Sequence, residues 1–121
     1  MSEATYKIVN GIDKHWTNKN GLTHRDGAPA VECRNGTKLW YRNGQKHRVG
    51  GPAIECANGI KQWYQNGKLH RIDGPAIEDP QSGKMFYARG YYCHTFKEFF
   101  NAIPKENREA ALLLIAEFEN V

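Results

Sequence analysis

Five histidines and three cysteines are the side chains of this chain that suit metal binding or nucleophilic chemistry. Three of the histidines recur at an interval of 23 residues, as His24, His47 and His70. If each stands at the same place in a repeated unit of two strands, neighbouring copies lie about 9–10 Å apart. Zinc ligands lie only ~2.0–2.3 Å from the metal, so these histidines cannot share one ion. We therefore expect each histidine to pack within its own unit, and we expect no metal site and no cofactor.

Cys93 and His94 place a thiol and an imidazole next to each other in the sequence. Adjacent residues of a strand point to opposite faces, so this pair cannot act as nucleophile and base. It is the residual candidate for zinc, which metal analysis of the purified protein would test. The same inter-unit spacing exceeds the roughly 7 Å limit for bridged Cα atoms, which disfavours a disulfide between Cys33 and Cys56.

Glutamates also recur at the repeat interval, as Glu32, Glu55 and Glu78. They form a ladder across units instead of a paired acid and base in one pocket, and we expect each to pair with a nearby arginine. No motif brings acid, base and nucleophile together. The sequence therefore predicts no catalytic residues and no enzyme.

These residues belong to a sequence motif that occurs three times in the chain. The copies are "NGLTHRDGAPAVE" at 20–32, "NGQKHRVGGPAIE" at 43–55 and "NGKLHRIDGPAIE" at 66–78. End units of an array are usually degenerate because they must close the stack. We predict a single domain over 1–121, with a degenerate half-repeat over 1–19, three repeats over 20–93 and a helical cap over 94–121.

Asn-Gly pairs mark the turns within and between units, and they suit two-residue hairpin loops because both residues tolerate positive φ. The predicted fold class is mostly β (α+β), a single antiparallel meander of hairpin repeats of about 23 residues, capped or covered by C-terminal helices. The expected strands are 29–33, 38–42, 52–56, 61–65, 75–79 and 84–88.

Side-chain alternation with two-residue turns predicts two different faces. Val31 and Trp40, with their copies and the histidines, are expected on a buried apolar face. Glu32, Tyr41 and Arg48, with their copies, are expected on an amphipathic face that is open to water.

The C-terminal segment has a helical pattern. Pro104 suits a first helical turn, and an apolar stripe at helical spacing follows it, which predicts a helix over about 104–119. Thr95 is the expected N-cap of a shorter preceding helix. These helices are expected either to cover the tryptophan face or to close the end of the sheet.

Composition is that of a soluble globular protein, with 40% hydrophobic and 25% charged residues. No apolar run approaches the ~18 residues of a membrane span, and the first residues do not resemble a signal peptide. The odd number of cysteines does not suit a secreted disulfide scaffold. We expect a cytoplasmic location.

The motif "NGKLHRIDGPAIE" at 66–78, together with "NGIKQWYQNG" at 58–67, resembles the short MORN-like repeats of bacterial and tailed-phage proteins. The resemblance covers residues 10–93. It implies an elongated sheet of β-hairpins that binds proteins or, less securely, lipid head groups. The "HR.DGPA" half departs from the MORN pattern, so lipid binding does not carry over. By analogy, a short phage protein of this kind is an accessory factor acting on a host component in the host cytoplasm.

A repeat sheet offers a broad rigid surface, which favours a macromolecular partner over a small molecule. We expect a protein partner, bound by copied residues that have no role in the core. The expected contact residues are Tyr41, Tyr64, Tyr87, Arg48, Arg71 and Arg25. The alternative is a nucleic acid or another anionic ligand, because lysines and arginines interleave with aromatic residues along the sheet. Oligomeric state and the identity of the partner do not follow from the sequence.

Overall fold

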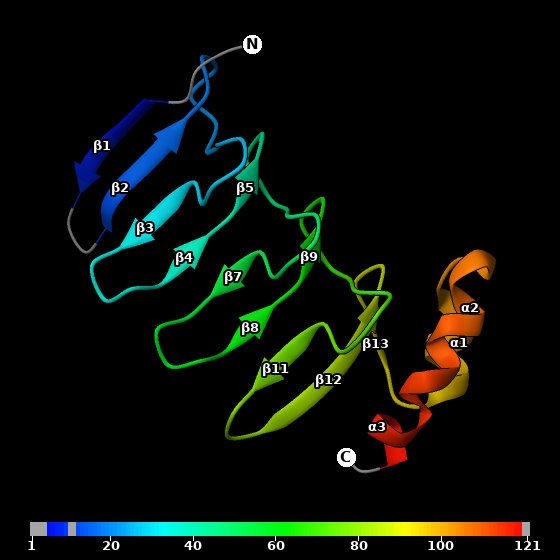
Figure 1. Cartoon of the computed structure of the whole chain (residues 1–121). Helices are drawn as coiled ribbons and strands as arrows, with labels where there is room; N and C mark the ends of the chain where they lie inside the picture. Colours follow the sequence, from blue (N-terminus) through cyan, green and yellow to red (C-terminus); the bar gives the residue numbers. More distant parts are fainter. Residues whose placement is uncertain (1–4, 10–11, 120–121) are drawn as a thin grey trace.

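Short strands and frequent turns arrange the chain as a series of hairpins with helices at its C-terminal end (Figure 1). The computed structural model describes residues 5–9 and 12–119. Within these ranges, nine strands form one antiparallel sheet in the order β1-β2-β3-β4-β7-β8-β11-β12-β13, and four more form two small hairpins. The fold is therefore mostly β, and its main sheet is the predicted antiparallel meander.

The strands of the main sheet are β1 (Thr5–Val9), β2 (Ile12–Thr17), β3 (Val31–Cys33), β4 (Lys38–Leu39), β7 (Ile54–Glu55), β8 (Lys61–Gln62), β11 (Ile77–Asp79), β12 (Gly83–Ala88) and β13 (Tyr91–Cys93). The small hairpins are β5 (Tyr41–Arg42) with β6 (Gln45–Lys46), and β9 (Tyr64–Gln65) with β10 (Lys68–Leu69).

Each unit contributes one hairpin to each of two side-by-side columns (Figure 1). The first column contains β3, β4, β7, β8, β11 and residues 83–85 of β12. The second column contains β5, β6, β9, β10, the end of β12 and β13. The predicted strands 38–42 and 61–65 are each divided between the columns, and sequence reasoning missed β6, β10 and β13 as separate strands.

A tryptophan joins the two columns in each of the middle units. The backbone N–H of Trp40 donates to the carbonyl of Ala53 in the first column, at 2.7 Å. The carbonyl of Trp40 accepts from the N–H of His47 in the second column, at 3.1 Å. Trp63 repeats this pattern with Ala76 and His70. The N–H of each tryptophan therefore bonds to the first column and its carbonyl bonds to the second, so this residue connects the two columns.

The first turn of each unit is one residue longer than the sequence predicted. Val31 pairs with Leu39 and Glu32 with Lys38, so the loop contains three residues, 34–36. Gly36 ends this loop at φ 98°, the left-handed position that a three-residue hairpin loop reserves for glycine. A slip of one residue moves every side chain of a strand to the other face. The prediction that Val31 shares a face with Trp40 is therefore wrong.

The second turn of each unit has the predicted length. Tyr41 pairs with Lys46 and Arg42 with Gln45, leaving Asn43 and Gly44 as a two-residue loop. Both loop residues have positive φ, at 49° and 84°. The expected placement of Trp40 opposite His47 is confirmed.

The corrected register defines a tryptophan face and a tyrosine face. The tryptophan face carries the residues Trp16, Trp40, Trp63 and Phe86, with Glu32, Glu55, Glu78, Lys38, Lys61, Lys84 and the arginines Arg25, Arg48 and Arg71. The tyrosine face carries Val31, Ile54 and Ile77, with Leu39, Gln62, Met85, Tyr41, Tyr64 and Tyr87.

Burial follows this arrangement. The small residues opposite the tryptophans, Ala30, Ala53 and Ala76, are completely buried. Val31 and Ile54 are buried on the tyrosine face, where long or apolar cross-strand neighbours flank them. Phe86 is buried as predicted, whereas Trp40, Trp63 and Ile77 are only half-buried.

The C-terminal helices close the end of the sheet and pack on its last strands. Helix α1 (Phe96–Ala102) begins at Thr95, whose side chain forms a capping box with Glu98, so the predicted N-cap is confirmed. The expected helix over 104–119 is broken into α2 (Arg108–Ala111) and α3 (Ile115–Glu119), with 3-10 turns at Lys105–Asn107 and Leu112–Leu114. Within the described residues, no helix is long and apolar enough to span a bilayer.

One buried core joins the cap to the last unit. Its buried residues are Phe86, Ala88, Cys93, Phe99, Ile103 and Ala111. Phe118 of α3 packs against this core, and its ring stacks on Phe86 with the centroids 3.8 Å apart. The bends between α2 and α3 allow both Ala111 and Phe118 to reach the same cluster.

The cap reproduces contacts that a further repeat would make. In the units before it, an arginine guanidinium lies over each tryptophan ring, at 3.7 Å for Arg25 on Trp16 and 3.8 Å for Arg48 on Trp40. Over Phe86 that place is taken by Phe118. Next to it, Glu117 accepts a hydrogen bond from Lys84 at 2.9 Å, as the glutamate of a following unit would face a lysine. The cap therefore covers Phe86, the last aromatic ring of the tryptophan face.

Candidate partner-binding surface

The three arginines predicted to contact a partner are held within the fold. The guanidinium of Arg71 lies 3.9 Å from the ring centroid of Trp63. It donates to the carbonyl of Pro75 at 3.0 Å and to the carboxylate of Glu78 at 3.1 Å, while its Nε donates to Asp73 at 2.8 Å. Its side chain is only 19% exposed. The structure thus gives Arg71 a structural role.

Arg25 and Arg48 repeat this arrangement on Trp16 and Trp40. The expected arginine–glutamate pairing is confirmed in all three units, as Arg25–Glu32, Arg48–Glu55 and Arg71–Glu78. A Cβ at Gly74 would lie 2.7 Å from the guanidinium carbon of Arg71, but the first unit carries Ala28 at the equivalent position, so the arginine stack does not require glycine there.

Lysines and glutamates alternate across the first column on the tryptophan face. Opposite residues of paired strands share a face, and opposite charges there stabilise the sheet modestly. From one strand to the next across the sheet, each of the following residues is paired with the one after it: Lys14, Glu32, Lys38, Glu55, Lys61, Glu78 and Lys84. Each of these lysines therefore faces carboxylates, and this part of the sheet does not present an uncompensated basic surface.

The second column has a different charge pattern. The segments 40–48, 63–71 and 86–94, which build it, contain no aspartate or glutamate. They carry Arg42, Lys46, Lys68 and Arg89. They also carry Arg48 and Arg71, which pair with glutamates of the first column. The positive charge of the repeat region is therefore concentrated on the second column.

A row of tyrosines crosses the second column on the tyrosine face. We call tyrosine row the residues Tyr41, Tyr64 and Tyr87 with their cross-strand partners Lys46, Leu69 and Tyr92. The ammonium of Lys46 lies 4.9 Å from the ring centroid of Tyr64, and the rings of Tyr87 and Tyr92 lie 5.4 Å apart. The first contact joins two successive units, and the second joins the two strands of the last hairpin.

The tyrosine row is partly open to solvent. All its members are half-buried except Tyr92, which is 44% exposed. Burial raises the pKa of Tyr64, and the nearby hydroxyls of Tyr41 and Tyr87 raise it further. The helices pack on the opposite side, against Phe86 and Ala88, which flank Tyr87 in β12. The cap therefore leaves this row accessible.

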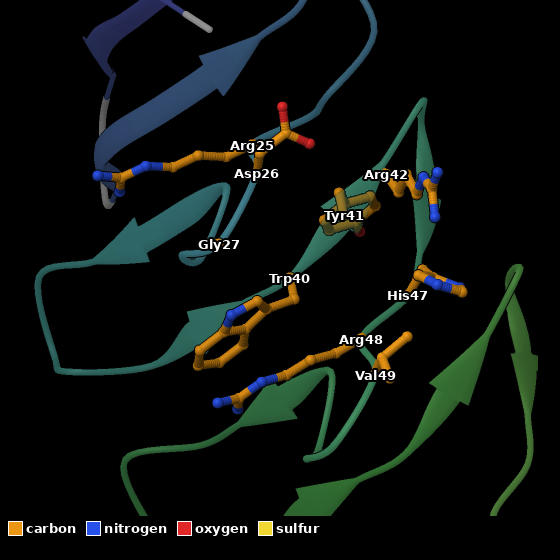
Figure 2. Close-up of a pocket in the computed structure, with 9 residues that line it drawn as sticks. All are labelled: Arg25, Asp26, Gly27, Trp40, Tyr41, Arg42, His47, Arg48 and Val49. Carbon is orange, nitrogen blue, oxygen red and sulfur yellow. The ribbon is translucent and has the colours of Figure 1, made fainter.

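The tryptophan face bears shallow hollows between successive units. Figure 2 shows one of about 370 Å³, in which Trp40 and Arg48 lie side by side near His47 and Val49. A hollow of about 520 Å³ follows one unit later, lined by Trp63, Arg71 and Val49 among others. Val49 is 79% exposed. The arginine–tryptophan stacks that form these walls are engaged in holding the repeats together.

The repeated histidines bridge neighbouring units. Nδ1 of His47 accepts a hydrogen bond from the backbone N–H of Asn66 at 3.0 Å, and Nδ1 of His70 accepts from Arg89 at 2.8 Å. His24 makes the same contact with Asn43. Each of these histidines therefore also bonds to the next unit, a contact that the repeat pattern alone did not predict. An accepting Nδ1 must be unprotonated, so these contacts require neutral imidazole.

Stability is expected to fall on mild acidification because of these histidines. Burial lowers the pKa of His47 and of His70 from the usual 6.5, and Arg42 and Arg89, respectively, lower it further. The unfolded chain then binds protons at a higher pH than the folded chain. Their contribution is complete above pH 6.5 and decreases as the pH falls through the lowered folded-state values.

The measurement is the melting temperature between about pH 7 and pH 5. In a His47→Asn, His70→Asn variant the amide oxygen can accept the same hydrogen bond without titrating, so we expect a smaller decrease. Equal decreases in the two proteins would show that these histidines do not cause the effect.

Among the described residues, no three His, Cys, Asp or Glu side chains come together in a way that could hold a metal ion. Cys93 is buried in the cap core, and burial raises the pKa of its thiol, which disfavours the reactive thiolate. Cys33 and Cys56 are free and half-buried.

Comparisons with protein-family models, with curated proteins and with solved structures returned no match to this chain. The resemblance to MORN-like repeats therefore stays a prediction from the sequence.

Proposed function

We propose that this chain is a non-catalytic repeat protein that binds a protein partner through its tyrosine row. The observation that carries the proposal is the row itself, a set of half-exposed tyrosines at equivalent positions of successive units, on the side of the sheet away from the helical cap. Tyrosine is enriched where protein interfaces concentrate their binding energy. The arginines predicted to lie beside it stack on the tryptophans and pair with the glutamates of the repeats.

The dimensions of the row suit a macromolecule. Tyr41 and Tyr87 stand two units apart, which corresponds to about 19 Å at the usual spacing of strands. A standard interface covers ~800 Å² on each partner, and a row of this length with its flanks provides such a patch. Because Tyr64 already contacts Lys46 and Tyr87 already contacts Tyr92, less conformational entropy of these rings is lost on binding.

The resemblance to phage and bacterial MORN-like proteins supports a biological role. On that analogy the chain is a phage-type accessory factor that engages and inhibits a host protein in the host cytoplasm. Fold-level analogy alone supports this step.

A second candidate function is binding of nucleic acid or another anionic ligand. The observation that favours it is the absence of acidic residues from the segments of the second column, together with its arginines, lysines and tyrosines. Against it, the lysines of the first column are matched by glutamates in register. The uncompensated positive charge is thus confined to the second column, whereas the sequence indicated basic residues along the whole sheet.

Affinity capture from bacterial lysate, with and without nuclease, separates the two candidates. We expect a protein partner that remains bound after nuclease treatment and that binds the purified chain directly. Loss of every partner after nuclease, with affinity that falls steeply as salt rises, would contradict protein binding and favour nucleic acid.

A further inference from the structure

A hollow of about 500 Å³ lies between the last unit and the helical cap. His70 and Arg89 of the second column line one side, and the segment 101–105 with Arg108 lines the other. The site exists only where the array meets its cap, so no other unit can contain it. It is separate from the tyrosine row.

The described lining of this hollow is strongly positive. It contains the permanent cations Arg89, Lys105 and Arg108, and none of its residues carries a carboxylate. Among the ion pairs formed by the described part of the chain, none involves these three side chains. Like charges around one hollow repel each other, and a bound anion would relieve that repulsion.

Arg108 has unused hydrogen-bonding capacity at this position. Its Nη2 donates to the carbonyl of Asn101 at 3.1 Å, but its Nε is buried and has no partner among the described residues. A buried N–H without an acceptor is unfavourable, and in a native structure such a group calls for an explanation.

Arg89 departs from the repeat at the same place. The equivalent turn position is asparagine in the two preceding units, Asn43 and Asn66, with φ of 49° and 50°. Arg89 adopts φ 54°, a left-handed conformation that asparagine tolerates better than arginine. The hydrogen bond from its backbone to His70 fixes the turn. The sequence thus places a guanidinium beside the hollow at a conformational cost.

We propose that this hollow binds the phosphate group of a small phosphorylated molecule. Guanidinium groups match phosphate oxygens with paired hydrogen bonds, and lysine adds a compact positive charge. The hollow is larger than a phosphate ion, which leaves space for the group that carries the phosphate. The phosphate source is either free phosphate or a monoester such as a nucleotide.

Calorimetry and thermal shift test the proposal with inorganic phosphate, adenosine monophosphate and adenosine, with chloride at matched ionic strength as the reference. We expect both phosphates to bind and to raise the melting temperature, and adenosine to do neither. Tighter binding of the monophosphate than of inorganic phosphate indicates a carried phosphate, and equal binding indicates the free ion.

Arg89→Asn is the informative variant, because it restores the residue of the other units and removes the unfavourable φ. We expect phosphate affinity to fall by about tenfold or more, while the melting temperature without ligand stays equal or rises. Arg42→Gln removes a cation of the second column outside this hollow and should leave phosphate binding unchanged. The proposal is overturned if phosphate has no effect beyond that of chloride, or if Arg89→Asn binds phosphate like the natural chain.

Discussion

Replacing Phe99 with alanine is expected to lower the free energy of unfolding by about 3–5 kcal/mol. Phe99 is completely buried in the cap core. Its ring centroid lies 5.2 Å from that of Phe86 on the sheet and 5.7 Å from that of Phe118 on α3. Truncation leaves a cavity between elements distant in sequence, so it weakens the closure of the array as well as the packing of α1.

Urea unfolding followed by tryptophan fluorescence and circular dichroism measures this effect. Leu113→Ala is the control, since Leu113 is 86% exposed on another turn of the helical cap and its truncation should change stability by no more than about 0.5 kcal/mol. A loss below about 1 kcal/mol for Phe99→Ala would show that the cap does not pack as described.

Replacing Tyr64 with alanine is expected to weaken partner binding by roughly 30-fold, equivalent to about 2 kcal/mol. Tyr64 is central in the tyrosine row and only half-buried, so its truncation should cost about 1 kcal/mol of stability. Arg71→Ala should behave in the opposite way. It removes the stack on Trp63 and the bonds to Pro75 and Glu78, and should lower stability by about 1–3 kcal/mol while the folded fraction still binds.

Affinity for the captured partner and urea unfolding are measured on each variant. Lys61→Ala is the matched control on the tryptophan face of the same unit, and it should retain binding. If Arg71→Ala abolishes binding without loss of stability, the arginines rather than the tyrosine row contact the partner.

Sequence periodicity was sufficient to predict the architecture, but it did not predict which residues share a face of the sheet. The repeat and the Asn-Gly turns led to the meander, and Thr95 and the apolar stripe led to a helical cap. The face assignment failed at the first loop of each unit, such as 34–36, because Asn-Gly occurs in both two-residue and three-residue hairpin loops. One extra residue there placed Ala30, instead of Val31, opposite Trp40.

The candidate site was predicted in part. The tyrosines were correctly separated from the tryptophans, since adjacent strand residues point to opposite faces whatever the turn length. The arginines were placed with them because stacking of Arg48 on Trp40, and of its copies, leaves no signal in composition or spacing. The alternation of Lys38 with Glu32 and Glu55 could have been found by testing both turn lengths.

The binding surface itself can be tested by site-specific crosslinking in bacterial lysate. A photoreactive phenylalanine analogue is introduced in place of Tyr64 on the tyrosine face or of Lys61 on the tryptophan face of the same unit. A nuclease-resistant crosslink to one protein from position 64, and none from position 61, is the predicted result. A protein crosslink from position 61 with none from position 64 would contradict binding through the tyrosine row.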